Sequence, residues 1–126
     1  MEPLACDTIV YRAMARKSWI DATTGTVLPT AFFRRPPPAD DDGLSVDVES
    51  ARSCSSALSR CYGVVSLHVG RLRNLGLDVV VDEAPHANIT GLPRNTDDVL
   101  QAERLASQLA RQARLVPPEH YEASDS

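Results

Sequence analysis

Aromatic residues, basic residues and long apolar runs are all in short supply in this sequence. Aromatics make up 5% of the 126 residues, so the core must consist mainly of Val, Leu and Ala. A net charge of −4 argues against a nucleic-acid partner, because such binders carry a basic excess. No apolar run approaches the ~18 residues that span a bilayer. The N-terminal stretch MEPLACDTIVYR has no basic n-region. We therefore expect a cytoplasmic protein with no membrane or nucleic-acid partner.

Cysteines are equally few, and the absence of known site motifs narrows the chemistry further. The chain has Cys6, Cys54 and Cys61, an odd number without a regular framework, which favours free core thiols in a reducing compartment. Too few thiols and histidines stand at ligand spacing for a zinc site, so we expect no metal. The motifs GxGxxG, GxxxxGK[ST], GxSxG and HExxH are all missing. These absences predict no cofactor and favour a protein that is not an enzyme.

The apolar pattern predicts a single α+β domain over residues 1–116. We expect strands at residues 7–14, 44–48, 64–69, 77–82 and 86–92, and helices near residues 50–62, 70–76 and 97–115. The sheet should be mixed or antiparallel and packed by two main helices. We expect a short strand at residues 26–33, which Pro29 restricts to a sheet edge or to an irregular segment. Residues 34–43 read as a Pro/Asp-rich loop, and residues 117–126 as a flexible C-terminal tail.

Two helices carry recognisable start signals. Ser50 or Ser53 can cap a helix that places Ala51, Cys54, Leu58 and Cys61 on one face and ends at Gly63. Thr96 can cap the longer helix, with Asp97 and Asp98 placed against the positive end of its dipole. The apolar stripe of this second helix consists of Val99, Ala102, Leu105, Ala106, Leu109, Ala113 and Val116.

Polar side chains concentrate in two places. The stretch VDEAPHANITGLPRN carries His86, Asn88 and Thr90 beside two prolines and a glycine. Each position also suits a strand-to-helix connection, yet these side chains are the first place to look for a site. Arg34 and Arg35 adjoin a proline run, where they could bind an anion or the carboxylate of a partner protein.

A pair of residues on the first strand suggests a specific enzyme family. Tyr11 and Arg12, followed by Ser45 on a later strand, resemble the arrangement in ADP-ribosyltransferase-like folds. The resemblance implies a nicotinamide nucleotide as substrate and makes Tyr11, Arg12, Ser45 and His86 the candidate catalytic residues. The family's strand-borne glutamate has no clear equivalent, and a buried Arg12 paired with an acid is the structural alternative. One concave pocket shared by Arg12, Ser45 and His86 would favour the enzyme. An ion-paired Arg12 would count against it.

The segments GLSVD, GVVSLHVGRLRNLGLDVV and PHANITGLP together resemble a group of small bacterial proteins that has no established activity. The resemblance spans roughly residues 9–116 and implies a bacterial cytoplasmic setting. Short proteins of this sort often belong to toxin–antitoxin or defence modules. Our first hypothesis is therefore a binding or accessory protein that acts through a protein partner or as a homodimer. An ADP-ribosyltransferase-like enzyme is the alternative.

Overall fold

The described residues of the protein fold around one antiparallel sheet of six strands. The structure is a computed structural model that describes residues 4–21, 23–33, 43–56, 61–93 and 97–120. The strands are β1 (Ile9–Ala13), β2 (Leu44–Asp47), β3 (Val64–His68), β4 (Asp78–Glu83), β5 (His86–Thr90) and β6 (Arg114–Leu115). They lie in the order β4-β5-β2-β1-β3-β6, and every neighbouring pair is antiparallel. The α+β prediction is confirmed, with the antiparallel form of the sheet.

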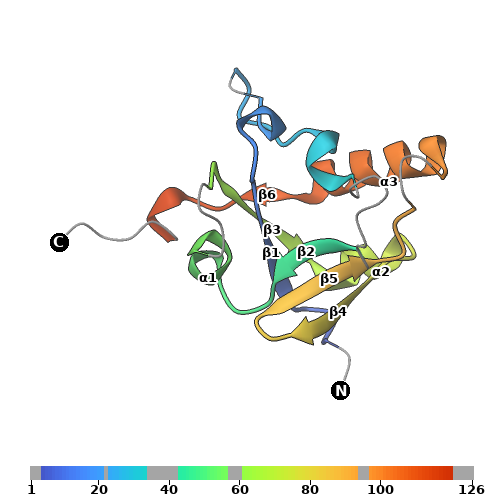
Figure 1. Cartoon of the computed structure of the whole chain (residues 1–126), viewed down its shortest axis with the longest axis horizontal. Coiled ribbons are helices and arrows are strands. Elements are labelled where there is room, and N and C mark those ends of the chain that lie inside the picture. The colour runs from blue at the N-terminus through green and yellow to red at the C-terminus, as the bar shows by residue number, and fades with distance from the viewer. Residues whose placement is uncertain (1–3, 22, 34–42, 57–60, 94–96, 121–126) are drawn as a thin grey trace.

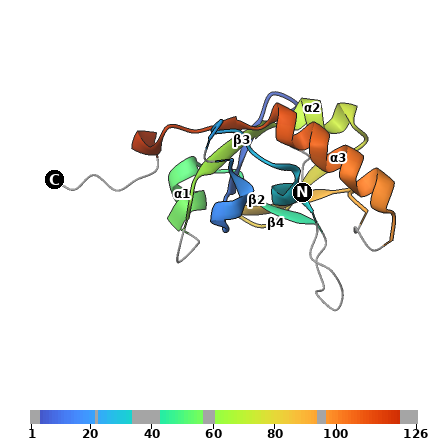
Figure 2. The same cartoon turned by 90° about the horizontal axis from the view of Figure 1, so that it is seen from above.

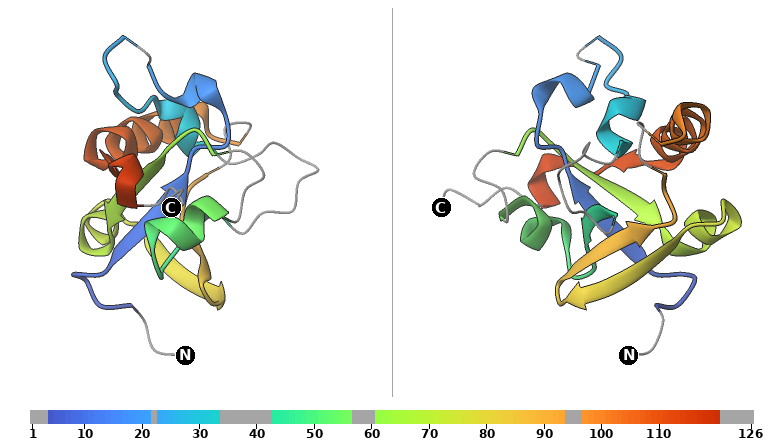
Figure 3. Two further views of the ribbon diagram at one scale, coloured as in Figure 1. Left: turned by 90° about the vertical axis from the view of Figure 1, so that its left-hand side faces the viewer. Right: turned by 45° about the vertical axis from the view of Figure 1, so that its right-hand side comes forward.

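One α-helix of the described residues lies at one end of the molecule, and two lie at the other end (Figure 1 and Figure 2). They are α1 (Ala51–Ser56), α2 (Val69–Asn74) and α3 (Val99–Gln112), with 3-10 turns η1 (Lys17–Trp19), η2 (Pro29–Phe32) and η3 (Pro118–His120). Helix α1 lies at the opposite end from α2 and α3 (Figure 1 and Figure 2). It contacts β1, β2 and β3, whereas α3 packs on η2 and β3 (Figure 3). No described helix is long and apolar enough to cross a membrane.

Strand β1 sorts its side chains onto two faces of the sheet, as the two-residue period of a strand requires. Val10 and Met14 are fully buried in the main core, together with Phe32 of η2 and Leu105 of α3. Tyr11 and Ala13 point to the other face, where they pack with Ala51 and Cys54 of α1. Arg12 therefore shares the main-core face of β1, and its neighbour Tyr11 does not.

The two ladders of β1 differ in length. With β3 it forms five consecutive residue pairs, from Ile9↔His68 to Ala13↔Val64. With β2 it forms one pair, Tyr11↔Asp47. Had this ladder continued, Ala13 would lie opposite Ser45. The two strands instead separate beyond Tyr11, on the side that leads toward η1 and η2. This separation creates the site described below.

The residues that cap the N-termini of the helices match the sequence predictions only in part. Ser50 caps α1 as predicted, because its Oγ accepts from the Ser53 N–H at 3.0 Å. Cys61 is not helical, however, so the prediction that one helix carries both Cys54 and Cys61 is wrong. The N-cap of α3 is Asp98, whose carboxylate accepts from the Gln101 N–H at 3.1 Å. Thr96 lies outside the described residues.

Two further expectations need correction. Residues 26–33 do not form a strand: Val27 makes an isolated bridge with Ile20, and the 3-10 turn η2 begins at Pro29. Proline fits a first helical position because its missing N–H has no intrahelical partner there. Val99, assigned to the buried stripe of α3, is 50% exposed because it is the first residue of the helix. The buried stripe runs from Ala102 to Leu109.

Candidate functional site

A cleft of about 610 Å³ opens where β1 and β2 separate. Gly43 and all four residues of β2 line it. Residues of β1 and of the segment that follows β1 also line it. Helix α1 contributes Ser53 and Cys54, and the β4–β5 connection contributes Pro85 and His86. The volume falls in the range of small-molecule sites. Gly43 is required at one end of the cleft, since a Cβ there would clash with the carbonyl oxygen of Ile89.

Arg12 bridges the gap between the separated strands. Its Nε donates to the carbonyl oxygen of Ala31 and its Nη1 to that of Ser45, both at 2.9 Å. Its Cζ lies 5.4 Å from the centroid of the Trp19 ring, within the range of a cation–π contact. The guanidinium thus takes the place of the missing β1–β2 ladder and joins both strands to η2.

Arg12 is a buried cation without a counter-ion among the described residues. The residue is 8% exposed, and burial lowers the pKa of its guanidinium to about 10. No carboxylate of a described residue lies within ion-pair distance of it. A guanidinium has five N–H donors, and the described residues accept from only Nε and Nη1. The predicted alternative was a buried pair of Arg12 with an acid. Arg12 is buried, and no acid of the described residues pairs with it.

Asp47 is the buried carboxylate of the same cleft, at 6% exposure. Its Oδ1 accepts from the backbone N–H groups of Glu49 and Ser50, at 2.7 and 3.2 Å. Its Oδ2 accepts from the Ser53 Oγ at 2.7 Å. These bonds tie the end of β2 to the start of α1, and they satisfy most of the acceptor capacity of the carboxylate without a cation.

Cys54 lies on α1 beside these groups, and its thiol stays protonated. Burial raises the pKa of Cys54 to about 12, and the nearby carboxylate of Asp47 adds to the rise. A thiol of this kind is a weak nucleophile near neutral pH, because the thiolate is the reactive form. Cys54 therefore contributes shape to the cleft, and no nucleophilic chemistry.

His86 stands at the end of the cleft that is far from β1. Its Nδ1 lies 2.6 and 2.8 Å from the two carboxylate oxygens of Asp82. Asp82 also accepts from the amide of Asn88 at 3.1 Å. The bond to His86 is the main reason that the pKa of Asp82 is lowered. In the ladder between β2 and β5, His86 is directly opposite Asp47.

The structure brings three of the four candidate catalytic residues together: Arg12, Ser45 and His86 all line the cleft. Tyr11 packs on the opposite face of the sheet, with α1, because it is adjacent to Arg12 in a strand. Among the binding candidates, Asn88 bonds Asp82, and the hydroxyl of Thr90 lies 3.5 Å from the carbonyl oxygen of Asp78. Arg34 and Arg35 lie outside the described residues.

The cleft residues that the sequence did not identify as site candidates include Trp19, Phe33, Asp47 and Ser53. Asp47 and Ser53 had a readable local signal. An aspartate that ends a strand just before a helix commonly bonds the first helical N–H groups. Trp19 and Phe33 had none, because their place beside Arg12 depends on how residues 16–33 fold back over β1.

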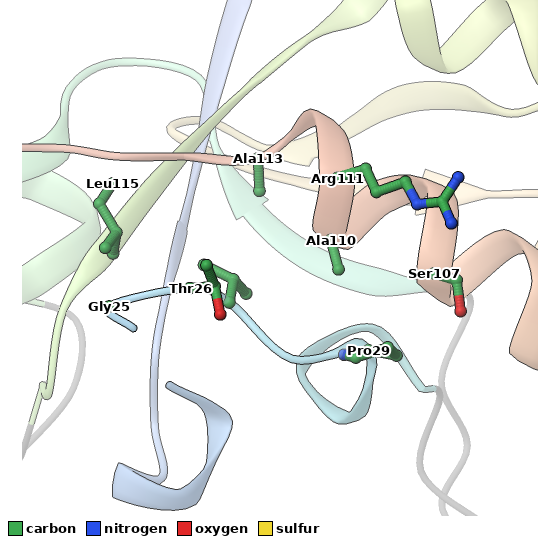
Figure 4. Close-up of a pocket in the computed structure, with 9 residues that line it drawn as sticks. Gly25, Thr26, Pro29, Ser107, Ala110, Arg111, Ala113 and Leu115 are labelled. Carbon is green, nitrogen blue, oxygen red and sulfur yellow. The ribbon is translucent and has the colours of Figure 1, made fainter. Parts of the chain in front are cut away.

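A second hollow, of about 520 Å³, lies between residues 25–29 and the C-terminal half of α3 (Figure 4). Small side chains line most of it, including Ser107, Ala110 and Ala113. Arg111 is its single charged lining residue in the described part of the chain, and its side chain extends along the helix, away from residues 25–29. Without a buried polar group, this groove offers no comparable chemistry.

The chain was also compared with protein-family models, curated proteins and solved structures, and none of the three comparisons found a match.

Proposed function

We propose that this protein binds a small anionic ligand in the cleft beside Arg12. The observation that carries the proposal is a buried guanidinium that lines a cavity. Among the described residues it has N–H donors without an acceptor and no carboxylate partner. An isolated buried charge is costly unless it is paired. A phosphate or carboxylate group of a ligand supplies the missing pairing, and arginine suits both groups because its fork of donors matches their oxygens.

The remainder of the cleft suits a ligand that also carries a flat ring. Trp19 and Phe33 lie on the Arg12 side, and Arg16 adds a second, exposed cation there. Aromatic walls with a few convergent polar groups are typical of small-molecule sites. The volume of about 610 Å³ accommodates a ligand of the size of a mononucleotide. We therefore take adenosine monophosphate and nicotinamide mononucleotide as the first probes.

An ADP-ribosyltransferase-like enzyme is the second candidate function. The shared cleft of Arg12, Ser45 and His86 favours it, since this was the arrangement expected of such a site. Two observations favour binding over transfer. Tyr11 does not line the cleft, and neither does any glutamate of the described residues. The hypothesis of a protein partner follows from the absence of site motifs in the sequence, with residues 34–42 and the C-terminal tail as its contact regions. Most of these residues lie outside the described residues.

Thermal unfolding in the presence of ligands tests the proposal. A ligand at a hundred times its Kd stabilises the folded state by about 2.7 kcal/mol. We expect both mononucleotides to raise the Tm by several degrees, and neutral adenosine to raise it less. Backbone amide NMR then locates the site. Shifts at Ala13, Ser45 and Val46, with none at Gly25 or Ser107 of the second groove, are the expected result. Absence of any stabilisation, or shifts confined to the groove, would contradict the proposal.

A further inference from the structure

The two ends of the Arg12 cleft have opposite hydrogen-bonding character. At the β1 end, Arg12 and Arg16 offer donors. At the far end, the lining groups are Asp47, Ser53, Pro85 and His86, and the described residues place no Lys or Arg among them. We call these four residues the acceptor end. A ligand that fills the whole cleft must therefore present an anion at one end and hydrogen-bond donors at the other.

The ring of His86 is held in a defined orientation at the acceptor end. Its Nδ1 bonds the carboxylate of Asp82, and the lowered pKa of Asp82 keeps that carboxylate ionised and accepting. Nδ1 therefore carries the ring hydrogen. In the neutral ring the other nitrogen, Nε2, is then an acceptor. No described residue bonds Nε2, so it is available to a ligand.

Asp47 supplies a second acceptor next to His86. The two residues face each other across the β2–β5 ladder, where directly opposed side chains have Cβ atoms about 5 Å apart. Three donors occupy the carboxylate of Asp47, which has roughly four lone-pair positions. The open position is on Oδ2, the oxygen that accepts one bond. Acceptors on two directly opposed residues can each accept a bond from one of two neighbouring hydroxyl groups.

The spacing between the ends limits the size of the ligand. The Nη1 of Arg12 bonds the Ser45 carbonyl oxygen of β2, and β5, which carries His86, is the next strand of the sheet. One inter-strand spacing amounts to about 5 Å. The cleft thus suits one molecule with an anionic group and a pair of hydroxyls separated by a distance of that order.

We infer that the ligand is a phosphorylated sugar or a nucleotide, with its phosphate on Arg12 and its sugar hydroxyls on His86 Nε2 and Asp47. This inference rests on the proposed function and specifies the ligand class of the same site. A site built to accept hydrogen bonds from hydroxyls discriminates against an analogue without them, because its buried acceptors are then left unpaired.

The test compares adenosine monophosphate with its 2′,3′-dideoxy analogue by calorimetric titration of the whole chain. Both carry the same charge and base, and they differ in two hydroxyls. We expect the wild-type protein to bind the dideoxy analogue about tenfold more weakly or worse. Equal binding of the two would overturn the inference and leave the proposed function standing. If neither binds, the proposed function itself fails. Tighter binding of phosphoethanolamine would assign the acceptor end to an ammonium group and would also overturn the inference.

Variants at β5 connect the preference to His86. His86→Phe keeps a planar ring without its nitrogens and should remove the preference between the two nucleotides. His86→Gln, which retains an acceptor, should restore part of it. Thr90→Val is the matched control, because Thr90 is on the same face of the same strand and does not line the cleft. It should leave the preference unchanged. A preference that survives in a folded His86→Phe protein would contradict the role of His86.

Discussion

The two sides of β1 are built differently, although both adjoin antiparallel strands. On the β3 side, five residue pairs close the sheet, and Val64, Val65 and Leu67 are buried. On the β2 side, one pair remains, and the guanidinium of Arg12 bonds a β2 carbonyl in place of the ladder. The first side needs no polar side chain. The second side depends on Arg12, which also lines the cleft.

This difference explains why a costly residue is present in the core. A continuous β1–β2 ladder would satisfy the Ser45 carbonyl through backbone N–H groups alone. Arg12 is instead buried, which lowers the pKa of its guanidinium, and it donates to two carbonyls. Its further N–H groups have no acceptor among the described residues. Costly features of this kind are often retained at functional sites. We interpret the open side of β1 as the part of the fold that serves binding.

The largest expected effect comes from removing the guanidinium. Arg12→Met leaves the Ala31 and Ser45 carbonyls without their donor, and we expect a loss of roughly 3 kcal/mol in the free energy of unfolding. Urea denaturation measures it. Arg16→Met, an exposed cation of the same cleft, is the matched control and should cost under about 0.5 kcal/mol. A loss below about 1 kcal/mol for Arg12→Met would show that the β1–β2 contact does not depend on this side chain.

A smaller loss is expected at the carboxylate of the cleft. Asp47→Ala removes the acceptor of two backbone N–H groups and of the Ser53 hydroxyl, which together connect β2 to α1. We expect a loss of about 2 kcal/mol. Asp47→Asn retains one oxygen acceptor and should lose less. Equal stability of the wild type and Asp47→Ala would contradict the role assigned to these bonds.

The effect that is smallest near neutral pH concerns the Cys54 thiol, and it grows as the pH rises. An unfolded cysteine ionises near pH 8.5, whereas the folded pKa of Cys54 is raised to about 12, mainly by burial. A raised folded pKa means that the unfolded state loses its proton first, so stability should fall as the pH rises from about 8.5 toward 12. The unfolding free energy of the wild type and of Cys54→Ala should be measured across this range. A fall of the same size in both would mean that Cys54 does not contribute to it.

Much of the fold could be predicted from the sequence, because the apolar pattern within each strand or helix is a local signal. The β-branched runs in β1, β3 and β4 and the stripe from Ala102 to Leu109 have periods that follow from burial of one face. Arg12, Ser45 and His86 were also named as candidates, through a resemblance. The separation of β1 from β2 could not be predicted, because strand pairing depends on contacts between residues far apart in the chain. For the same reason, Trp19 and Phe33 carried no signal in the sequence.

The fluorescence of Trp19 tests the central claim most directly. It is the only tryptophan in the chain, it lines the cleft, and it lies against Arg12. An anionic ligand on Arg12 must change the surroundings of this ring. We predict a saturable change in Trp19 emission on titration with adenosine monophosphate, weakened by added salt and absent with adenosine at the same concentrations. No change at millimolar nucleotide, or an equal change with adenosine, would contradict the account of Arg12 as an anion-binding residue.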